Sequence, residues 1–209
     1  MGKRQALAEY HRGSILAAAE RLFSEKGTER TTMDDIAREA EYSKATLYVY
    51  FQSKEEIVGA ILLNGLAMLK KRVHQASEEN EDWYTAYDAV CCSITDFYEE
   101  NPTAYEAVMG GSITGAEGSK SDQDIRRMAE EFCRELAGFL EYGMNRGAIR
   151  CSMAPMETVM LFWASVSGMI HMADRSADSL ERQVGRTRDE FLEDGFHMIL
   201  RAITRNFEN

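Results

Sequence analysis

The chain has 209 residues, of which 44% are hydrophobic, so it can bury a sizeable core and wholesale disorder is excluded. Only two prolines occur, and the abundance of Met, Ala, Glu and Leu favours helix nearly everywhere. The net charge of −11 argues against a nucleic-acid binder taken as a whole, but residues 1–55 hold nine basic and nine acidic residues. The excess of acid therefore lies in residues 56–209, and a DNA-binding surface is expected only at the neutral N-terminal end.

The N-terminal segment predicts four helices in close succession. The first covers residues 11–26, with apolar residues at helical spacing, and ends at Gly27. Thr32 opens a short second helix, because an acidic residue follows three positions later in the spacing of a capping box. After a four-residue step, Ser43 caps a third helix. Ser53, again with an acidic residue three positions later, opens a long fourth helix that fades beyond residue 74.

The remainder of the chain predicts five further helices. They begin with residues 83–100 and a short helix after Pro102, and continue with residues 125–145, 156–172 and 188–206. Residues 110–124 are rich in Gly, Ser and charge and predict a loop, while residues 174–185 predict a polar connection. We find no strand pattern. The expected fold is all-α with about nine helices: three helices in residues 1–53, followed by a larger helical domain over residues 54–209.

Three short helices with a tight step between the second and third are typical of a helix-turn-helix, whose third helix enters the major groove of DNA. Here that helix covers Ser43–Phe51. Lys44 and Thr46 can reach base edges from its first turn. Ala45 is small enough for close approach and, like the Thr46 methyl group, can contact a thymine methyl. These three residues are the candidates for base contacts.

A second set of residues is suited to phosphate contacts, which position a protein on DNA without specifying sequence. Tyr48, Tyr50 and Lys54 offer hydroxyl and ammonium groups. Thr31 and Thr32, at the start of the second helix, add hydroxyl and backbone N–H groups. The alternative for the tyrosines is a role as core aromatics, but both lie off the apolar face of their helix. The alternative for a lone lysine is an ordinary solvated charge.

The runs Thr31–Ala37 and Ser43–Glu56 closely resemble the TetR family of bacterial regulators. The resemblance is strong over residues 12–62 and softer in residues 147–150 and 162–168, which look like the family's effector domain. The family pattern assigns base contacts and phosphate contacts to residues already singled out: Lys44, Ala45 and Thr46 for bases, and Thr32, Tyr48, Tyr50 and Lys54 for phosphates. It further implies that residues 1–53 form a helix-turn-helix DNA-binding domain and residues 54–209 a helical ligand-binding and dimerisation domain. By the same resemblance, the protein is expected to be a homodimer on a palindromic double-stranded DNA operator, released by a small-molecule effector. Repression is the expected activity, with activation as the alternative.

One residue departs from the family pattern. Glu41 stands in the step between the second and third helices, where the family usually has glycine and where positive φ is often needed. A side chain in that conformation costs on the order of 1 kcal/mol. Glu41 also places an acid close to the DNA. Replacing the usual glycine by glutamate is therefore expected to affect both the geometry of the turn and the affinity for DNA.

The C-terminal two thirds hold candidates for an effector pocket and a dimer interface. Their Met and aromatic content suggests an apolar or aromatic effector. The candidate pocket residues are Trp83, Tyr87, Tyr98, Tyr105, Met109, Phe132, Phe139, Tyr142 and His171. The apolar helix 156–172 and the last helix are candidates for an intersubunit four-helix bundle. The candidate interface residues are Val159, Phe162, Trp163, Val166, Ile170, Phe191, Phe196, Ile199 and Ile203. For both sets, the alternative is plain protomer core.

Other function classes find little support. The four histidines are scattered, and no metal-ligand spacing, phosphate-binding loop or nucleophile motif occurs, so neither an enzyme nor a cofactor is expected. A helical interaction module without DNA binding is the second alternative, supported by Glu41 and the acidic body. The adjacent residues Cys91 and Cys92 are expected to be ordinary reduced thiols, and a redox switch is a weak alternative. Without a signal peptide or membrane-spanning run, we expect a cytoplasmic protein with no membrane partner.

Overall fold

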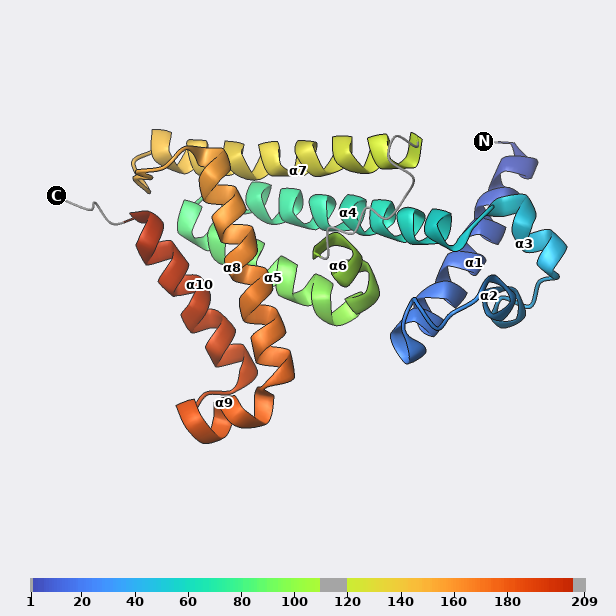
Figure 1. The fold of residues 1–209 in the computed structure, drawn as a ribbon. Coiled ribbons are helices and arrows are strands. Elements are labelled where there is room, and N and C mark those ends of the chain that lie inside the picture. The colour runs from blue at the N-terminus through green and yellow to red at the C-terminus, as the bar shows by residue number, and fades with distance from the viewer. Residues whose placement is uncertain (1, 110–119, 205–209) are drawn as a thin grey trace. The chain divides into compact units, whose positions relative to one another are not determined.

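A computed structural model of the chain describes residues 2–109 and 120–204. All the regular structure in these ranges is α-helical, which confirms the expected fold class (Figure 1). Ten helices follow in order: α1 (Lys3–Lys26), α2 (Met33–Glu39), α3 (Lys44–Tyr50), α4 (Lys54–Glu78), α5 (Trp83–Glu100), α6 (Pro102–Met109), α7 (Lys120–Asn145), α8 (Pro155–Arg175), α9 (Ala177–Val184) and α10 (Arg188–Thr204). The helix missed by the sequence is α9, which replaces the predicted polar connection.

Several helix boundaries differ from those predicted. Helix α1 begins eight residues earlier than residue 11, and its first turns are largely exposed, so no apolar periodicity marks them. Helix α7 begins at Lys120, inside the predicted loop, and residues 110–119 of that loop lie outside the described residues. The predicted end of the last helix at residue 206 also lies outside them.

The chain folds as two compact units. Unit 1 comprises residues 1–68 and 97–128, and unit 2 comprises residues 69–96 and 129–209. The division falls within α4, so the structure groups the first part of this helix with α1–α3, whereas the sequence places the boundary in front of it. The functional division into a DNA-binding and an effector domain stays a prediction.

In unit 1, α1–α3 enclose a small core. Leu47 of α3 and Phe51, the residue that follows α3, are both fully buried in it. Helix α6 packs on α1, where the Thr103 hydroxyl donates to the Glu20 carbonyl oxygen at 3.5 Å. Helix α6 also approaches α4 closely, because a Cβ at Gly65 would lie 3.1 Å from the Cβ of Ala104. Unit 1 thus fixes α3 and the start of α4 on one compact support.

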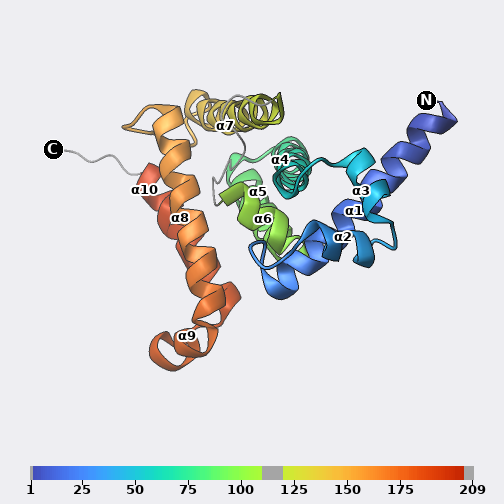
Figure 2. The ribbon, with the colours of Figure 1, turned by 45° about the vertical axis from the view of Figure 1, so that its right-hand side comes forward.

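In unit 2, Trp83 of α5 is the centre of an aromatic stack. Its ring lies 5.0 Å from that of Phe139 and 5.7 Å from that of Tyr87, and its indole N–H donates to the Phe139 carbonyl oxygen at 3.0 Å. Helices α8 and α10 lie side by side and are joined through α9 (Figures 1 and 2). None of the described helices combines the length and the apolar character needed to cross a membrane.

Candidate functional site

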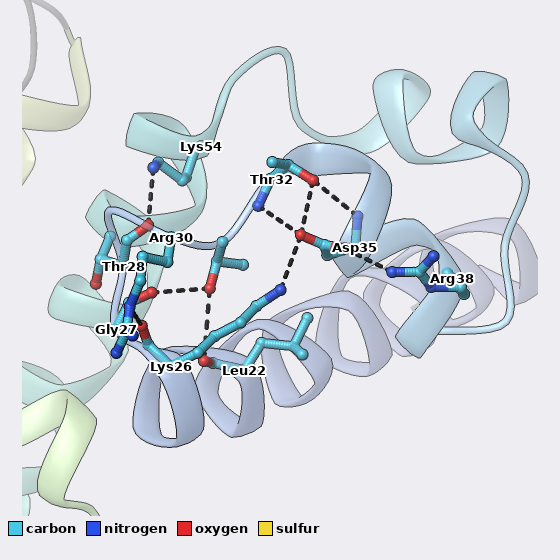
Figure 3. Close-up of polar contacts among 10 residues, drawn as sticks. Leu22, Lys26, Gly27, Thr28, Arg30, Thr32, Asp35, Arg38 and Lys54 are labelled. Carbon is cyan, nitrogen blue, oxygen red and sulfur yellow. Dashed lines mark hydrogen bonds and ion pairs between the residues drawn. The ribbon is translucent and has the colours of Figure 1, made fainter.

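The start of α2 is held by the capping box that the sequence predicts. Thr32 Oγ1 accepts from the Asp35 amide at 3.2 Å, and the Asp35 carboxylate accepts from the Thr32 amide at 3.1 Å (Figure 3). The same carboxylate binds Lys26 at 2.8 Å and Arg38 at 2.6 Å. The hydrogen bonds from Lys26 and Thr32 hold the pKa of Asp35 far below its usual range. Asp35 therefore stays ionised and ties α2 to the end of α1.

The step between α2 and α3 is a Schellman turn. The Tyr42 amide donates to the Ala37 carbonyl oxygen at 2.8 Å, and the Glu41 amide donates to the Arg38 carbonyl oxygen at 3.1 Å. This pairing places Glu41 in the left-handed region with φ = 61°, and it is the one non-glycine residue with positive φ among those described. The expectation of a positive φ here is confirmed, so the turn carries the backbone cost that glycine would avoid.

Helix α3 presents its residues on two faces. Ser43 caps it by accepting from the Thr46 amide at 3.1 Å. Leu47, with Phe51 four residues later, faces the core of α1–α3. The outward face is formed by Lys44, Ala45, Tyr48 and Val49, which are exposed, and by Thr46 and Tyr50, which are half-buried. The structure thus brings all three predicted base-contact residues to the outer side of one short helix.

Lys44 forms an ion pair with a residue of α2 across the helix-turn-helix. Its ammonium group lies 2.7 Å from the Asp34 carboxylate of α2, and this hydrogen bond raises the pKa of Lys44. Both side chains are well exposed, and exposed ion pairs contribute little to stability. Lys44 can therefore leave Asp34 for another acceptor at small cost.

The predicted phosphate contacts divide into two groups. Tyr48 and Thr32 are exposed, and Tyr50 is half-buried at the end of α3. Thr31, in contrast, is only 1% exposed, and its hydroxyl donates to the Gly27 carbonyl oxygen at 2.9 Å. That burial is incompatible with a phosphate contact from the Thr31 side chain, so this prediction needs correction. The hydroxyl instead satisfies a carbonyl at the end of α1.

Lys54 lies at the first position of α4, half-buried against the α1–α2 loop. Its ammonium group donates to the Thr28 carbonyl oxygen at 2.8 Å, as the close-up of this region shows (Figure 3). The ammonium group has three N–H donors, so this bond leaves others for a phosphate oxygen. Lys54 therefore joins the loop to α4 while remaining a candidate phosphate contact.

One exposed residue of α3 was missed by the sequence reasoning. Val49 is 74% exposed, an unusual position for a β-branched apolar side chain. It follows Ala45 by four residues and therefore lies on the same face, one turn further along. The four-residue spacing from Ala45 is visible in the sequence and could have singled out Val49. Its exposed methyl groups make it a further candidate for contact with a thymine methyl.

Unit 2 contains a cavity of about 410 Å³ between α5, α7, α8 and α10. Two of the predicted pocket residues, Tyr87 and Phe139, line it. The others do not: Trp83, Tyr98, Tyr105, Phe132, Tyr142 and His171, while the side chain of Met109 lies outside the described residues. The lining is mainly aliphatic: Val90, Leu136, Leu140, Met153, Val159, Leu161, Met198, Ile199 and Ile203, with Phe162 and Ala202. Selecting by aromatic content therefore missed most of the wall.

The physical reasons for these misses differ between residues. Trp83 is buried in the aromatic stack, and Phe132 packs edge-on against Trp163 at 5.5 Å. Tyr142 lies on the surface beside Arg146, whose guanidinium is 5.0 Å from its ring centre. Tyr98 and Tyr105 contact each other edge-on at 4.9 Å and belong to unit 1. Aromatic residues at helical spacing here mostly build the core.

The polar groups lining the cavity are already bonded within the protein. The Tyr87 hydroxyl donates to the Phe196 carbonyl oxygen at 2.9 Å, and the Thr158 hydroxyl donates to the Ala154 carbonyl oxygen at 3.2 Å. Ser165 donates to the Leu161 carbonyl oxygen at 2.7 Å. The lining residues include none with a charged side chain. The cavity is therefore suited to a neutral, largely apolar molecule.

The predicted dimer-interface residues mostly face the protomer interior. Six are buried: Val159, Val166, Ile170, Phe196, Ile199 and Ile203, while Phe162, Trp163 and Phe191 are half-buried. They pack α8 and α10 together within the chain, so this prediction needs correction for the buried six. The exposed apolar residues of the same two helices are Met156, Met160, Leu161, Met172 and Met198. A packing partner would contact these side chains.

The adjacent thiols carry no sign of a reactive site. Cys91 is buried and Cys92 is exposed, and burial raises the pKa of both thiols. Nearby carboxylates, from Asp88 in both cases and from Asp96 beside Cys92, raise them further. A thiol with a raised pKa is a poor nucleophile at neutral pH.

The geometry of α2 and α3 is that of a helix-turn-helix, and comparisons with known proteins agree. Residues 15–61 match the family model described as bacterial regulatory proteins, tetR family. The uncharacterized HTH-type transcriptional regulator YfiR of Bacillus subtilis is 26% identical over 164 residues, covering 76% of this chain and 78% of YfiR. The HTH-type transcriptional activator FasR of Mycolicibacterium smegmatis is 33% identical over 97 residues, covering 46% and 44%.

Solved structures extend the likeness along most of the chain. The TetR family transcriptional regulator PfmR from Thermus thermophilus has a TM-score of 0.71 and 25% identity, covering 91% of this chain and 99% of that one. The ketosteroid transcriptional regulator KstR2 of Mycobacterium tuberculosis, at 20% identity and a TM-score of 0.66, shares the fold and covers 93% of this chain and 95% of that one. Residues 15–61 therefore match a TetR-family DNA-binding domain, and the relatives and the fold support a TetR-family transcriptional regulator.

Replacing Glu41 by glycine should stabilise the protein. Glycine adopts φ = 61° without the Cβ conflict, so we expect the free energy of unfolding to rise by about 1 kcal/mol. Chemical denaturation followed by circular dichroism measures this difference. Glu41→Ala is the matched control, because it removes the carboxylate and keeps the Cβ. Equal stabilisation by both variants would assign the effect to charge and contradict the backbone account.

Proposed function

We propose that this chain is a ligand-responsive repressor that binds a palindromic operator as a homodimer and is released by a small apolar effector. The single observation that carries the proposal is the outward face of α3. There, Lys44, Ala45, Thr46 and Val49 project from a helix whose other face is fixed by the buried Leu47–Phe51 pair. Repression is the simpler activity, because it requires only that the operator be occupied.

The charges around α3 support DNA binding despite the acidic body. Two of the acids in this region are held by basic partners other than the proposed base contacts: Asp35 by Lys26 and Arg38, and Glu39 by Arg21 at 3.0 Å. Pairing lowers the repulsion that these carboxylates would exert on phosphate. The excess of acid in residues 56–209 repels phosphate, so DNA is expected to approach the N-terminal segment, which has no net charge.

The cavity of unit 2 supports an apolar effector. Its polar side chains are already bonded to backbone carbonyls, so a charged ligand would lose hydration without gaining an ion pair from the lining. A volume of about 410 Å³ suits a small organic molecule. We therefore propose a neutral apolar or aromatic effector in this cavity.

The exposed apolar residues of α8 and α10 support a homodimer. Met160 and Met172 are 66% and 56% exposed, and Met198 of α10 is 62% exposed. Apolar side chains gathered on two neighbouring helices are typical of a surface covered by a partner. A second copy presents the same face through two-fold symmetry, which is the symmetry of a palindromic operator.

Helix α4 supplies a route between the effector and DNA. It begins at Lys54, a candidate phosphate contact, and continues without interruption to Glu78 in unit 2. An effector that favours one orientation of α4 changes the spacing of the two α3 helices in the dimer. A preference of a few kcal/mol for the non-binding state is enough to release the operator.

The DNA-binding role predicts different effects for base and phosphate contacts. The affinity is measured on the duplex that the protein selects from a random pool and on versions of it with one base changed. In Lys44→Ala, the ratio of these two affinities should fall by about tenfold or more. Tyr48→Phe should weaken binding to all duplexes alike. Fluorescence anisotropy across a salt series measures both. Lys71→Ala removes an exposed lysine of α4 outside the site and should change neither. Equal, sequence-independent losses from Lys44→Ala and Tyr48→Phe would contradict base reading by Lys44.

The effector role predicts that the neutral probe N-phenyl-1-naphthylamine binds with a rise in fluorescence. Ser165→Trp places a large ring at the cavity wall and should reduce the affinity by about tenfold or more. Gln75→Trp, on the exposed side of α4, is the control and should bind as the unmodified protein does. Undiminished binding by Ser165→Trp would show that the probe binds elsewhere.

The dimer role predicts that Met160→Glu weakens self-association by about tenfold or more, because the change occurs twice in a two-fold interface. Sedimentation equilibrium measures the dissociation constant. Met68→Glu is the matched control, an exposed methionine of α4 in unit 1. A dimer equally tight in the Met160→Glu variant would exclude this face as the interface.

A further inference from the structure

Helix α1 contacts the outer edge of the helix-turn-helix through His11. The imidazole Nδ1 and the Tyr42 hydroxyl are 2.7 Å apart, joined by a half-buried hydrogen bond between residues 31 positions apart. The rings of His11 and Tyr42 meet edge-on, with centres 5.4 Å apart. The ring of Tyr50 lies 5.5 Å from that of His11. His11 therefore touches a residue of the turn before α3 and the last residue of α3.

The neighbouring Arg12 completes this contact. Its guanidinium donates to the Tyr50 carbonyl oxygen at 2.8 Å and lies 4.2 Å from the centre of the Phe51 ring. Arg12 thus holds the C-terminal end of α3 through its backbone. Of His11 and Arg12, only His11 contacts residues at both ends of α3, Tyr42 before it and Tyr50 at its end.

The need for such a contact follows from the shape of α3. The helix has seven residues and one buried side chain, Leu47, while the second buried anchor, Phe51, is the extended residue that follows it. With one buried side chain in the helix itself, the rotation of α3 about its own axis depends on contacts at its two ends. Rolling moves Lys44, Ala45 and Val49 across the base edges, and hydrogen bonds to bases require tight alignment. A lateral contact at both ends removes that freedom.

We propose that His11 is a positioning residue for sequence recognition, which sets the roll of α3 through Tyr42 and Tyr50 without contacting the bases itself. The inference rests on the proposed reading of bases by α3. Loss of this contact should affect sequence specificity more than overall DNA affinity. The rotation of α3 changes its alignment with base edges and has much less effect on phosphate contacts. Asparagine at position 11 can reproduce the imidazole Nδ1, whereas alanine leaves Tyr42 without this partner.

The test compares His11→Ala, His11→Asn and Tyr42→Phe with the full-length protein on two duplexes. One is the duplex selected from a random pool, and the other is the same duplex with its central half-site bases changed. We expect His11→Ala to lower the ratio of the two affinities by about fivefold or more, with less than about a twofold loss on the changed duplex. His11→Asn should restore most of the ratio.

Tyr42→Phe keeps the ring and removes only the hydroxyl, so it tests the hydrogen bond even if His11→Ala folds poorly. Combined with His11→Ala, it should cost no more than His11→Ala alone, since both changes remove the same bond. Leu7→Ala, an exposed residue of α1, is the control and should leave the ratio unchanged. An unchanged ratio in both His11→Ala and Tyr42→Phe, or equal losses on both duplexes, would overturn the role of His11. An unmodified protein that selects no sequence would instead contradict the proposed function.

Discussion

The packing of α3 against the core of α1 and α2 is the constraint on which the site depends. Leu47 and Phe51 bury completely, and this fixes which residues of the same seven-residue helix face outward. If α3 were turned so that its other side faced α1 and α2, Lys44 would be buried and Leu47 exposed. The apolar anchors thus decide which residues form the outward face of α3, and a surface fixed in this way reduces the ordering that the proposed DNA binding would require.

The connections on either side of α2 hold this arrangement in place. The Thr32–Asp35 capping box and the Lys26 ion pair fix the start of α2, while the Schellman turn at Glu41 fixes the entry to α3. The turn keeps its geometry although Glu41 lacks the conformational freedom of glycine. Its two backbone hydrogen bonds and the packing of α3 outweigh a local cost of about 1 kcal/mol.

Local signals in the sequence were sufficient for much of unit 1. The capping box at Thr32 and the N-cap at Ser43 occur as expected, because these contacts involve residues three positions apart. Ser53 caps α4, but the Glu56 carboxylate accepts from the Gln52 amide at 2.7 Å, so that box is only half formed. Thr31 was misplaced because its burial depends on a bond to Gly27 across the loop.

Unit 2 was harder to predict because its features depend on packing between distant helices. The sequence shows that α8 and α10 are apolar but not which of their faces meets the other, so Val166 and Ile170 were assigned to a partner and lie in the core. The cavity is a gap left by aliphatic side chains from four helices, and no spacing in one helix marks it. The spacing of residues identifies the apolar face of a helix, but only the folded structure shows which helix packs against that face.

The central claim is that α3 reads a specific DNA sequence as part of a two-fold symmetric dimer. Selection of duplexes from a random pool by the purified protein, followed by sequencing, tests it most directly. The account predicts enrichment of a palindrome whose half-sites are separated by about one helical turn or a multiple of it, bound less tightly as salt increases. A bound pool with no enriched sequence, or with single half-sites only, would contradict it.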